Sequence, residues 1–169
     1  MDAQTLKDQQ APLKARYRDS PEAALVTLEA QSGLDADGVA CSIEVGGKLA
    51  AAGLHPATGG SGAELCSGNM LLEALAACAG VTLRAVATAK DIALKGGAVK
   101  VEGDLDFRGT LGLDKTAPVG FKAIRLRFEL ETDASDDAVA DLITLTERYC
   151  VVLQTLKAPA TMTLETCRK

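Results

Sequence analysis

The sequence predicts an α+β fold in which half-buried antiparallel sheets lie against two long helices. Two segments carry apolar residues at helical spacing, and each contains a cysteine: LLEALAACAGVTLRAV with Cys78 and LITLTERYCVVLQTL with Cys150. Other segments alternate between apolar and charged residues, as strands with one wet face do. Because the elements follow the order βββ, α, ββ, α, β, the pattern favours helices laid on sheet.

The N-terminal part is expected to be an arm followed by short strands. Residues 1–22 are polar, with a helix expected over Leu6 to Tyr17. Strands are expected at Ala24 to Gln31, Val39 to Val45 and Lys48 to Gly53. The first two would be joined by the turn-rich loop SGLDADG, whose Asp and Gly residues tolerate hairpin conformations.

The first long helix should follow the loop HPATGGSGAEL, with Ser67 as its N-cap and its end near Lys90. Cys78 should face inward, because it shares a helix side with Leu71 and Leu75. The apolar run in this segment is too short to predict a membrane span.

The second half of the chain should contain a strand pair, a helix and a last strand. One strand alternates from Val99 to Arg108 and the next from Ile124 to Glu131. The second helix should be capped by Ser135 or Asp133, with Asp136 and Asp137 in its first turn, and it should run through Cys150. A final strand over Ala160 to Cys167 should bury Met162 and Leu164.

Composition limits the function classes. The 169 residues fit one domain, and a net charge of −5 disfavours nucleic acid and anionic membranes as partners. The N-terminus lacks the residue order of a signal peptide, so we expect a soluble, cytoplasmic protein. Five cysteines, an odd number, fit reduced thiols better than a disulfide framework.

The stretch GLHPATGGSGAELCSGNMLLEALAACAGVTLRAVA, together with ERYCVVLQTL, resembles the OsmC/Ohr family of osmotically inducible and organic hydroperoxide resistance proteins. The resemblance runs from about Val26 to the C-terminus. It implies a single OsmC-like domain over residues 1–169. It also implies an intertwined homodimer with the helices central and sheets of both chains around them.

The resemblance also assigns the two helix cysteines. Cys78, in the context AAC, would be the peroxidatic thiol, and Cys150 the resolving thiol. The chain would then be a thiol-dependent peroxidase for small organic hydroperoxides, recycled by a dithiol reductant and needing no cofactor. The alternative is a non-catalytic protein of the same fold that binds an apolar small molecule or senses oxidation.

The sequence leaves open which group activates Cys78. In better-known family members an Arg near the N-terminal hairpin, held by a Glu, reaches the peroxidatic Cys. Here Gly68 stands at the Glu position, and residues 26–45 contain no Arg. Arg16 and Arg18 in the arm, from the other subunit, and Glu64 are the main candidates. Arg84 and Glu73 project away from the Cys78 side of the helix, and Arg148 lies beside Cys150.

The remaining reactive residues are expected to be structural. Cys66 precedes the expected cap, Cys41 should lie in the core, and Cys167 should be an exposed thiol. His55, the single histidine, sits in a loop. No spacing typical of a metal site occurs, and the run Gly59 to Gly62 lacks the Lys and Ser or Thr of a phosphate loop.

Overall fold

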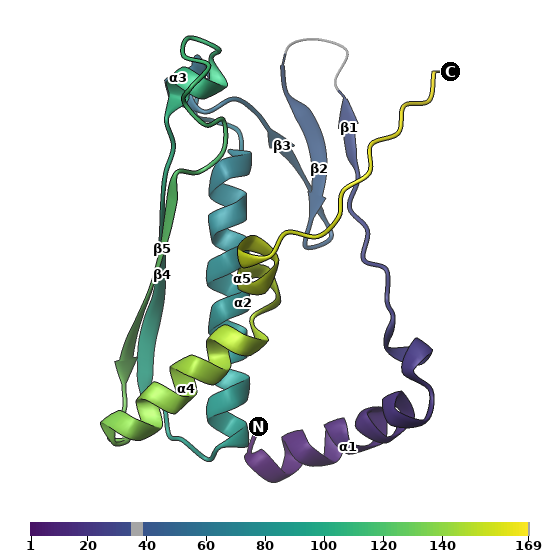
Figure 1. The fold of residues 1–169 in the computed structure, drawn as a ribbon, viewed down its shortest axis with the longest axis vertical. Helices are drawn as coiled ribbons and strands as arrows, with labels where there is room; N and C mark the ends of the chain where they lie inside the picture. Colours follow the sequence, from purple (N-terminus) through teal and green to yellow (C-terminus); the bar gives the residue numbers. More distant parts are fainter. Residues whose placement is uncertain (35–38, 169) are drawn as a thin grey trace.

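The computed structural model describes residues 1–34 and 39–168. Its long axis follows helix α2, Ser67–Ala89, and a two-stranded antiparallel hairpin of β4 (Gly96–Asp104) and β5 (Ala123–Glu131) runs along one side of that helix (Figure 1). The mixed α+β class expected from the sequence is therefore confirmed.

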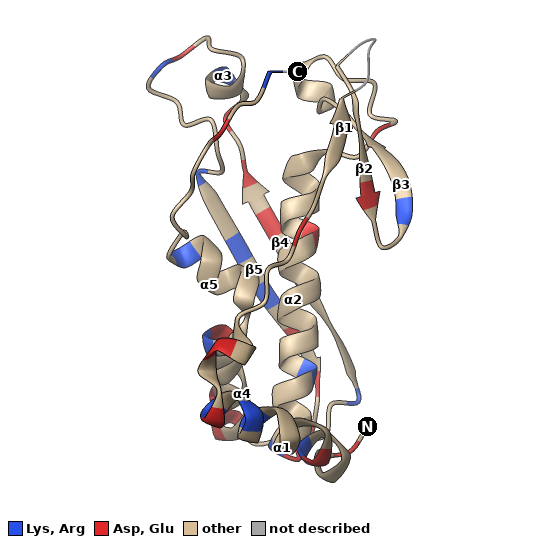
Figure 2. Ribbon diagram, turned by 90° about the vertical axis from the view of Figure 1, so that its right-hand side faces the viewer, with Lys and Arg blue, Asp and Glu red and all other residues tan. Residues whose placement is uncertain are grey.

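One face of the β4–β5 hairpin is apolar and packs on α2, whereas the other face is charged. Val99 pairs with Phe128 and Val101 with Leu126, so these side chains lie on the face toward the helix. The outer face carries ion pairs, including Lys100 with Glu129 at 2.7 Å, and Figure 2 shows the charges along the strands. The alternation predicted for these strands is confirmed.

The second helical segment packs across α2. Helix α4 covers Asp136–Tyr149, and its N-cap Ser135 accepts a hydrogen bond from Ala138 N–H at 3.3 Å. Helix α5 covers Val151–Lys157, so the helix expected to run through Cys150 is in fact two helices that meet at this residue. The cap and the acidic first turn were predicted correctly, but the continuous helix was wrong.

The core follows a line of α2 residues spaced by four. Leu75, Ala79, Leu83 and Ala87 are buried, and Leu142 of α4 is fully buried against them. Leu71, expected inside, is 38% exposed. By length and composition α2 could cross a bilayer, contrary to the expectation from the sequence, but this apolar face is the one that forms the core.

The N-terminal part forms a separate small sheet. Strands β1 (Ser32–Leu34), β2 (Cys41–Val45) and β3 (Lys48–Ala52) pair antiparallel in the order β1-β2-β3. The strand expected at Ala24 to Gln31 does not form. The 3₁₀-helix η1, Pro21–Ala24, is followed by exposed chain without a neighbouring strand. Of the predicted loop 32–38, the first three residues are β1, and 35–38 lie outside the described residues.

The arm before this sheet is a helix, as predicted. Helix α1 covers Ala3–Asp19, and Asp2 caps it by accepting a hydrogen bond from Thr5 N–H at 2.7 Å. No residue of α1 is buried. Its start lies near the C-terminal end of α2, and the rest of the helix extends away from the body (Figure 1).

Three other boundaries differ from the expectation. The N-cap of α2 is Cys66, not Ser67, and no side chain caps this end. Strand β4 ends at Asp104, because Asp106 caps the short helix α3, Phe107–Thr110, where a continued strand was expected. The 3₁₀-helix η2, Pro56–Thr58, lies within the predicted loop.

The last strand expected at Ala160 to Cys167 does not form either. Residues 158–168 are exposed and carry no strand hydrogen bonds. Met162 is 86% and Leu164 is 98% exposed, because an alternating segment forms a strand only where another strand offers it an edge.

The position of the core predicts which substitutions lower the free energy of unfolding. Leu142→Ala should lower the free energy of unfolding by about 2–5 kcal/mol, since it leaves a cavity at a fully buried position. Leu113→Ala, at a position 75% exposed, should change it by less than about 0.5 kcal/mol. Denaturant unfolding checks both variants, and equal losses would contradict this assignment of the core.

Candidate functional site

The two helix cysteines lie in one apolar cluster. Cys78 is half-buried near the middle of α2, and Cys150 is fully buried where α4 ends. Both contact the buried residues Leu75 and Ala79. The sequence prediction that the helices bring these two thiols together therefore agrees with the structure.

The backbone at Cys150 breaks the helix but keeps its own N–H and C=O groups hydrogen-bonded. Its φ of −73° and ψ of 105° are extended, while its N–H donates to Thr146 O at 3.0 Å and its C=O accepts from Gln154 N–H at 2.9 Å. The residue thus ends α4 and starts α5. Because α5 begins here, the N–H groups of Val151 and Val152 have no partner within their own helix.

These free N–H groups act on the Cys78 thiol. Burial alone would raise its pKa, but the N–H of Val152, the Cys150 thiol, the Thr82 hydroxyl and the N–H of Val151 together lower it below the ordinary value. Each of these donors stabilises the thiolate more than the thiol. Cys78 is therefore poised to be the nucleophile of the pair.

Cys150 is shifted in the opposite direction. Burial raises its pKa, and the neighbouring Cys78 raises it further through the hydrogen bond and through its charge, against the N–H groups of Leu153 and Val152. The opposite directions of the two shifts favour ionisation of Cys78 before Cys150. Two neighbouring thiols that differ in this way suit nucleophilic attack followed by disulfide formation.

The activating residues suggested by the sequence lie elsewhere in this chain. Arg16 and Arg18 are exposed in the last turn of α1. Glu64 lies in the loop before α2 and accepts a hydrogen bond from the Ser61 hydroxyl, which lowers the pKa of the Glu64 carboxyl. None of these three is among the groups that lower the pKa of Cys78.

The other charged candidates also have different contacts. Arg84 donates to Leu94 O at 3.1 Å, and the Arg148 guanidinium lies over the Tyr149 ring at 5.4 Å. Glu73 is exposed. Among the described residues, the groups that lower the pKa of Cys78 are backbone N–H groups, a hydroxyl and the Cys150 thiol.

Sequence reasoning missed these donors for different reasons. Thr82 follows Cys78 by one helical turn, so the spacing of four could have identified it. The N–H groups of Val151 and Val152 could not be found in this way, because the pattern predicted a continuous helix through Cys150. Only the break makes them available.

A small cavity lies next to the cluster that contains the cysteine pair, although neither cysteine lines it. It has a volume of about 290 Å³, and Leu75 and Leu153, which contact the cysteine cluster, form part of its wall with Ile124 and Leu126 of β5. Among the described residues, no group of His, Cys, Asp and Glu could hold a metal ion. The site therefore offers thiol chemistry beside a space for an apolar group.

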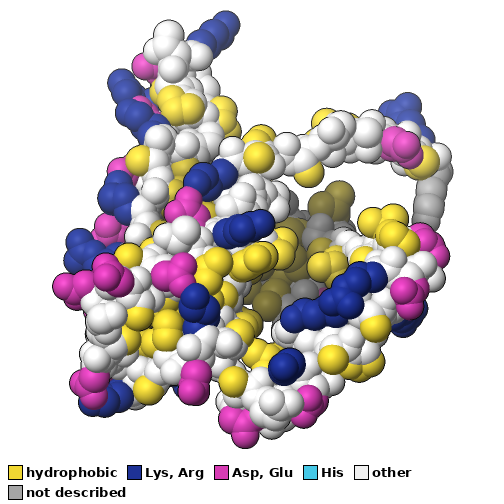
Figure 3. All heavy atoms as spheres, turned by 60° about the horizontal axis from the view of Figure 1, so that its bottom comes forward, with side chains coloured by type: hydrophobic (Ala, Val, Ile, Leu, Met, Phe, Trp, Pro, Cys, Tyr) yellow, Lys and Arg dark blue, Asp and Glu magenta, His cyan; other side chains and the backbone are white. Residues whose placement is uncertain are grey.

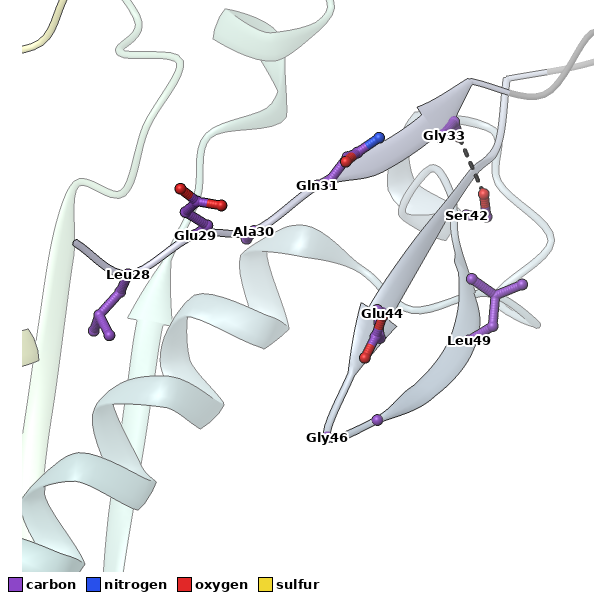
Figure 4. A pocket seen from close by; sticks show the side chains of 10 residues that line it. Leu28, Glu29, Ala30, Gln31, Gly33, Ser42, Glu44, Gly46 and Leu49 are labelled. Atoms are coloured by element: carbon purple, nitrogen blue, oxygen red, sulfur yellow. Dashed lines mark hydrogen bonds between the residues drawn. The ribbon is translucent and has the colours of Figure 1, made fainter. Parts of the chain in front are cut away.

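A larger hollow lies away from these cysteines. It measures about 830 Å³ and is lined by residues of the segment 28–31 and of the hairpin β2–β3. Figure 4 shows Leu28 at the end of this segment that lies away from the hairpin, and Glu44 on β2 near the hairpin turn at Gly46. Its lining is open and polar and contains no cysteine, so it offers no thiol chemistry.

Comparison with known proteins fits this arrangement. The family model described as OsmC-like protein matches residues 60–165, more than half of the chain and both site cysteines. The chain belongs to the OsmC-like family. The comparison with curated proteins gives no match.

Solved structures of OsmC-like proteins share the fold. An OsmC-like protein from Mycoplasma pneumoniae aligns with a TM-score of 0.64 at 20% identity, covering 79% of this chain and 89% of that one. An organic hydroperoxide resistance protein OsmC from Legionella pneumophila gives 0.61 at 20% identity, with 80% and 92% covered. A putative organic hydroperoxide resistance protein from Vibrio cholerae, with captopril bound in one active site, gives 0.54 at 19%, with 80% and 89% covered.

The donors around Cys78 predict a pH profile. Its alkylation by iodoacetamide should persist to lower pH than that of an ordinary thiol and should fall as the pH drops through its lowered pKa. Thr82→Val removes one donor to the thiolate, so the thiolate fraction near neutral pH should fall by about tenfold. Thr88→Val, also on α2 but with its hydroxyl donating to Arg84 O, is the control and should leave the profile unchanged. Identical profiles for both variants would contradict the assignment.

Proposed function

We propose that the protein is a thiol-dependent peroxidase that reduces small organic hydroperoxides with Cys78 as nucleophile and Cys150 as resolving thiol. The contact between a thiol whose pKa is lowered and one whose pKa is raised carries this proposal. Membership of the OsmC-like family, with relatives named as organic hydroperoxide resistance proteins, supports the substrate class.

In the first step, the Cys78 thiolate attacks one oxygen of the hydroperoxide. The O–O bond breaks, a Cys78 sulfenic acid forms, and the alkoxide takes a proton and leaves as an alcohol. The N–H groups of Val151 and Val152 hold the thiolate before attack. Sulfur is oxidised by two electrons and the peroxide is reduced by two.

In the second step, the Cys150 sulfur attacks the sulfenic sulfur, a disulfide forms, and the hydroxyl leaves as water with the Cys150 proton. An external dithiol then reduces this disulfide and is itself oxidised to a disulfide. The contact between the cysteines means that the resolving step needs no large movement of the helices.

The apolar surroundings favour organic over inorganic peroxides. An alkyl or aryl group would be buried against Leu75, Leu153 and the neighbouring β5 side chains. Such burial contributes about 25 cal/mol per Å² of apolar surface, and hydrogen peroxide has no such surface. Cumene hydroperoxide is therefore a suitable test substrate.

One equivalent of cumene hydroperoxide should yield a disulfide between Cys78 and Cys150 within one chain, found by peptide mapping. In Cys150→Ser, the Cys78 sulfenic acid should persist and be labelled by dimedone, and turnover with a dithiol should fall by more than about tenfold. Cys167→Ser, at an exposed position, is the matched control and should retain full turnover. Mapping that places Cys66 or Cys41 in the disulfide would refute the assignment.

A second candidate function, oxidation sensing or binding of an apolar molecule without turnover, is favoured by one observation. No arginine is among the donors that stabilise the Cys78 thiolate. The two functions differ in rate: a reaction with cumene hydroperoxide no faster than that of a free thiol, with the disulfide still forming, would support sensing. Catalytic turnover with an added dithiol supports the peroxidase.

We also propose that the protein acts as an intertwined homodimer. Its accessible surface is 12703 Å², whereas a folded monomer of 17.4 kDa exposes about 7,900 Å². The excess per chain is about 4,800 Å², so burial of this surface in both chains would exceed the total of about 2,000–5,000 Å² of common obligate interfaces, as chains that intertwine would require. The exposed apolar residues on the segment 25–31 and on the C-terminal tail contribute to it.

The shape of the chain supports the same proposal. Seen from below, the molecule is hollowed between its helical body and the N-terminal arm, with hydrophobic side chains at the hollow (Figure 3). A second copy would fill this space, and the segments 25–31 and 160–167 would find strand edges there. The arm also carries Arg16 and Arg18, which a dimer could bring to the Cys78 site of the other copy.

Sedimentation velocity should give a dimer at micromolar concentration, with a single unfolding transition whose midpoint rises with protein concentration. Leu164→Asp, which places a charge at a position 98% exposed in one chain, should weaken the dimer. Val119→Asp, on the loop before β5 and 66% exposed, is the control. A folded monomer at this concentration would disprove the proposal.

A further inference from the structure

A second cavity lies at the N-terminal end of α2, on the side facing the β4–β5 hairpin. It measures about 350 Å³, which is within the range of small-molecule sites. The chain has only two Tyr, three Phe, one His and no Trp. Three of these six rings, His55, Phe107 and Phe121, line this one cavity.

Loops distant in sequence build its walls. The rings of His55 and Phe107 stack with centroids 4.8 Å apart and planes inclined by 18°, which joins the loop before α2 to helix α3. Phe121 lies against Gly103 of β4, where a Cβ would come within 2.5 Å of the ring. The position of Phe121 therefore depends on glycine at residue 103.

Gly68 leaves the cavity open. A Cβ at this position would lie 3.6 Å from both Leu105 and Phe121 and 3.7 Å from the Cys66 sulfur, which are ordinary contacts. Glycine is required here neither by crowding nor by a positive φ. The absent side chain thus creates space that a larger residue would fill.

Two polar groups define the chemistry of a ligand. The Nδ1 atom of His55 accepts a hydrogen bond from Ala57 N–H at 3.0 Å, so the neutral ring carries its proton on Nε2 and acts as a donor there. Asn69 supplies an amide at the exposed mouth. The carboxylate of Asp104, also in the wall, is held by Arg125, with one contact of 2.8 Å.

This cavity is distinct from the cysteine pair. Cys66 and Cys78 are separated by twelve residues of α2, which corresponds to about 18 Å along the helix. The two regions are linked by Phe121, which also lines the smaller cavity beside Leu75 and Leu153. A ligand in the cavity at the N-terminal end of α2 would contact Phe121, and this ring also forms part of the wall of the cavity beside Leu75 and Leu153.

We propose that this cavity is a binding site for a small, neutral, planar aromatic molecule that carries a hydroxyl or another hydrogen-bond acceptor. The ligand ring packs among Phe107, Phe121 and Leu105, and its polar group accepts from His55 Nε2–H. A bicyclic molecule fits, because a cavity of about 150 Å³ already holds one benzene ring. Neither Cys78 nor Cys150 lines this cavity.

The probe is 2-naphthol, titrated into the full-length protein and followed by the backbone amide signals of Asn69 and Gly103. We expect saturable binding with a Kd on the order of 0.1–1 mM, as ligands of this size give. Gly68→Leu fills the cavity and should weaken binding at least about tenfold, while helix propensity favours Leu over Gly. His55→Phe keeps a ring for the stack but removes the donor, and should weaken binding about threefold to tenfold.

Two control variants distinguish binding at this cavity from binding at the cysteine pair or at the surface of α2. Gly80→Ala, on the same helix, adds a Cβ that makes one ordinary contact of 3.8 Å with Val99 and should bind 2-naphthol like the wild type. Cys78→Ser should also bind it unchanged. Equal affinity of Gly68→Leu and the wild type would overturn the proposal, and so would signal changes centred on Cys78 and Cys150 or the lack of saturation.

Discussion

The burial of one face of α2 determines the rest of the structure. Leu75, Ala79, Leu83 and Ala87 recur every four residues, and this line receives the β4–β5 hairpin and α4. Two of the four are alanines, and small side chains let neighbouring elements approach the helix closely. Because this line is buried, it fixes the position and orientation of Cys78 relative to Cys150.

The break between α4 and α5 at Cys150 is the second constraint, and it provides the hydrogen-bond donors of the site. In a continuous helix, the N–H groups of Val151 and Val152 would donate hydrogen bonds to carbonyls of the preceding turn. With an extended ψ at Cys150, these donors are free and reach the Cys78 sulfur instead. Backbone geometry thus supplies donors to Cys78 in a chain that has Gly68 ten positions before that cysteine.

Periodicity was enough to predict the elements that bury a face within one chain. The α2 line and the alternation in β4 and β5 are set by local sequence, and the structure agrees. The same alternation gave a wrong prediction at residues 24–31 and 160–167. A strand also needs a neighbouring strand to pair with, and neither segment pairs with a strand among the described residues. The cysteine pair followed from the helix faces, but its hydrogen-bond donors depended on a break that no spacing reveals.

The two thiols share a hydrogen bond, but the main causes of their pKa shifts differ. Burial raises the pKa of Cys150, whereas hydrogen-bond donors outweigh burial at Cys78 and lower its pKa. While Cys78 is a thiolate, its charge and the shared proton raise the pKa of Cys150 and keep that thiol protonated, so only one sulfur is a nucleophile toward an incoming oxidant. In the proposed reaction, Cys78 becomes a sulfenic acid and no longer carries the negative charge that opposed ionisation of Cys150. The N–H groups of Leu153 and Val152, which lower the pKa of Cys150, are then less opposed. Oxidation of the first thiol would thereby favour ionisation of the second, and the proposed order of the two steps agrees with the electrostatics of the pair.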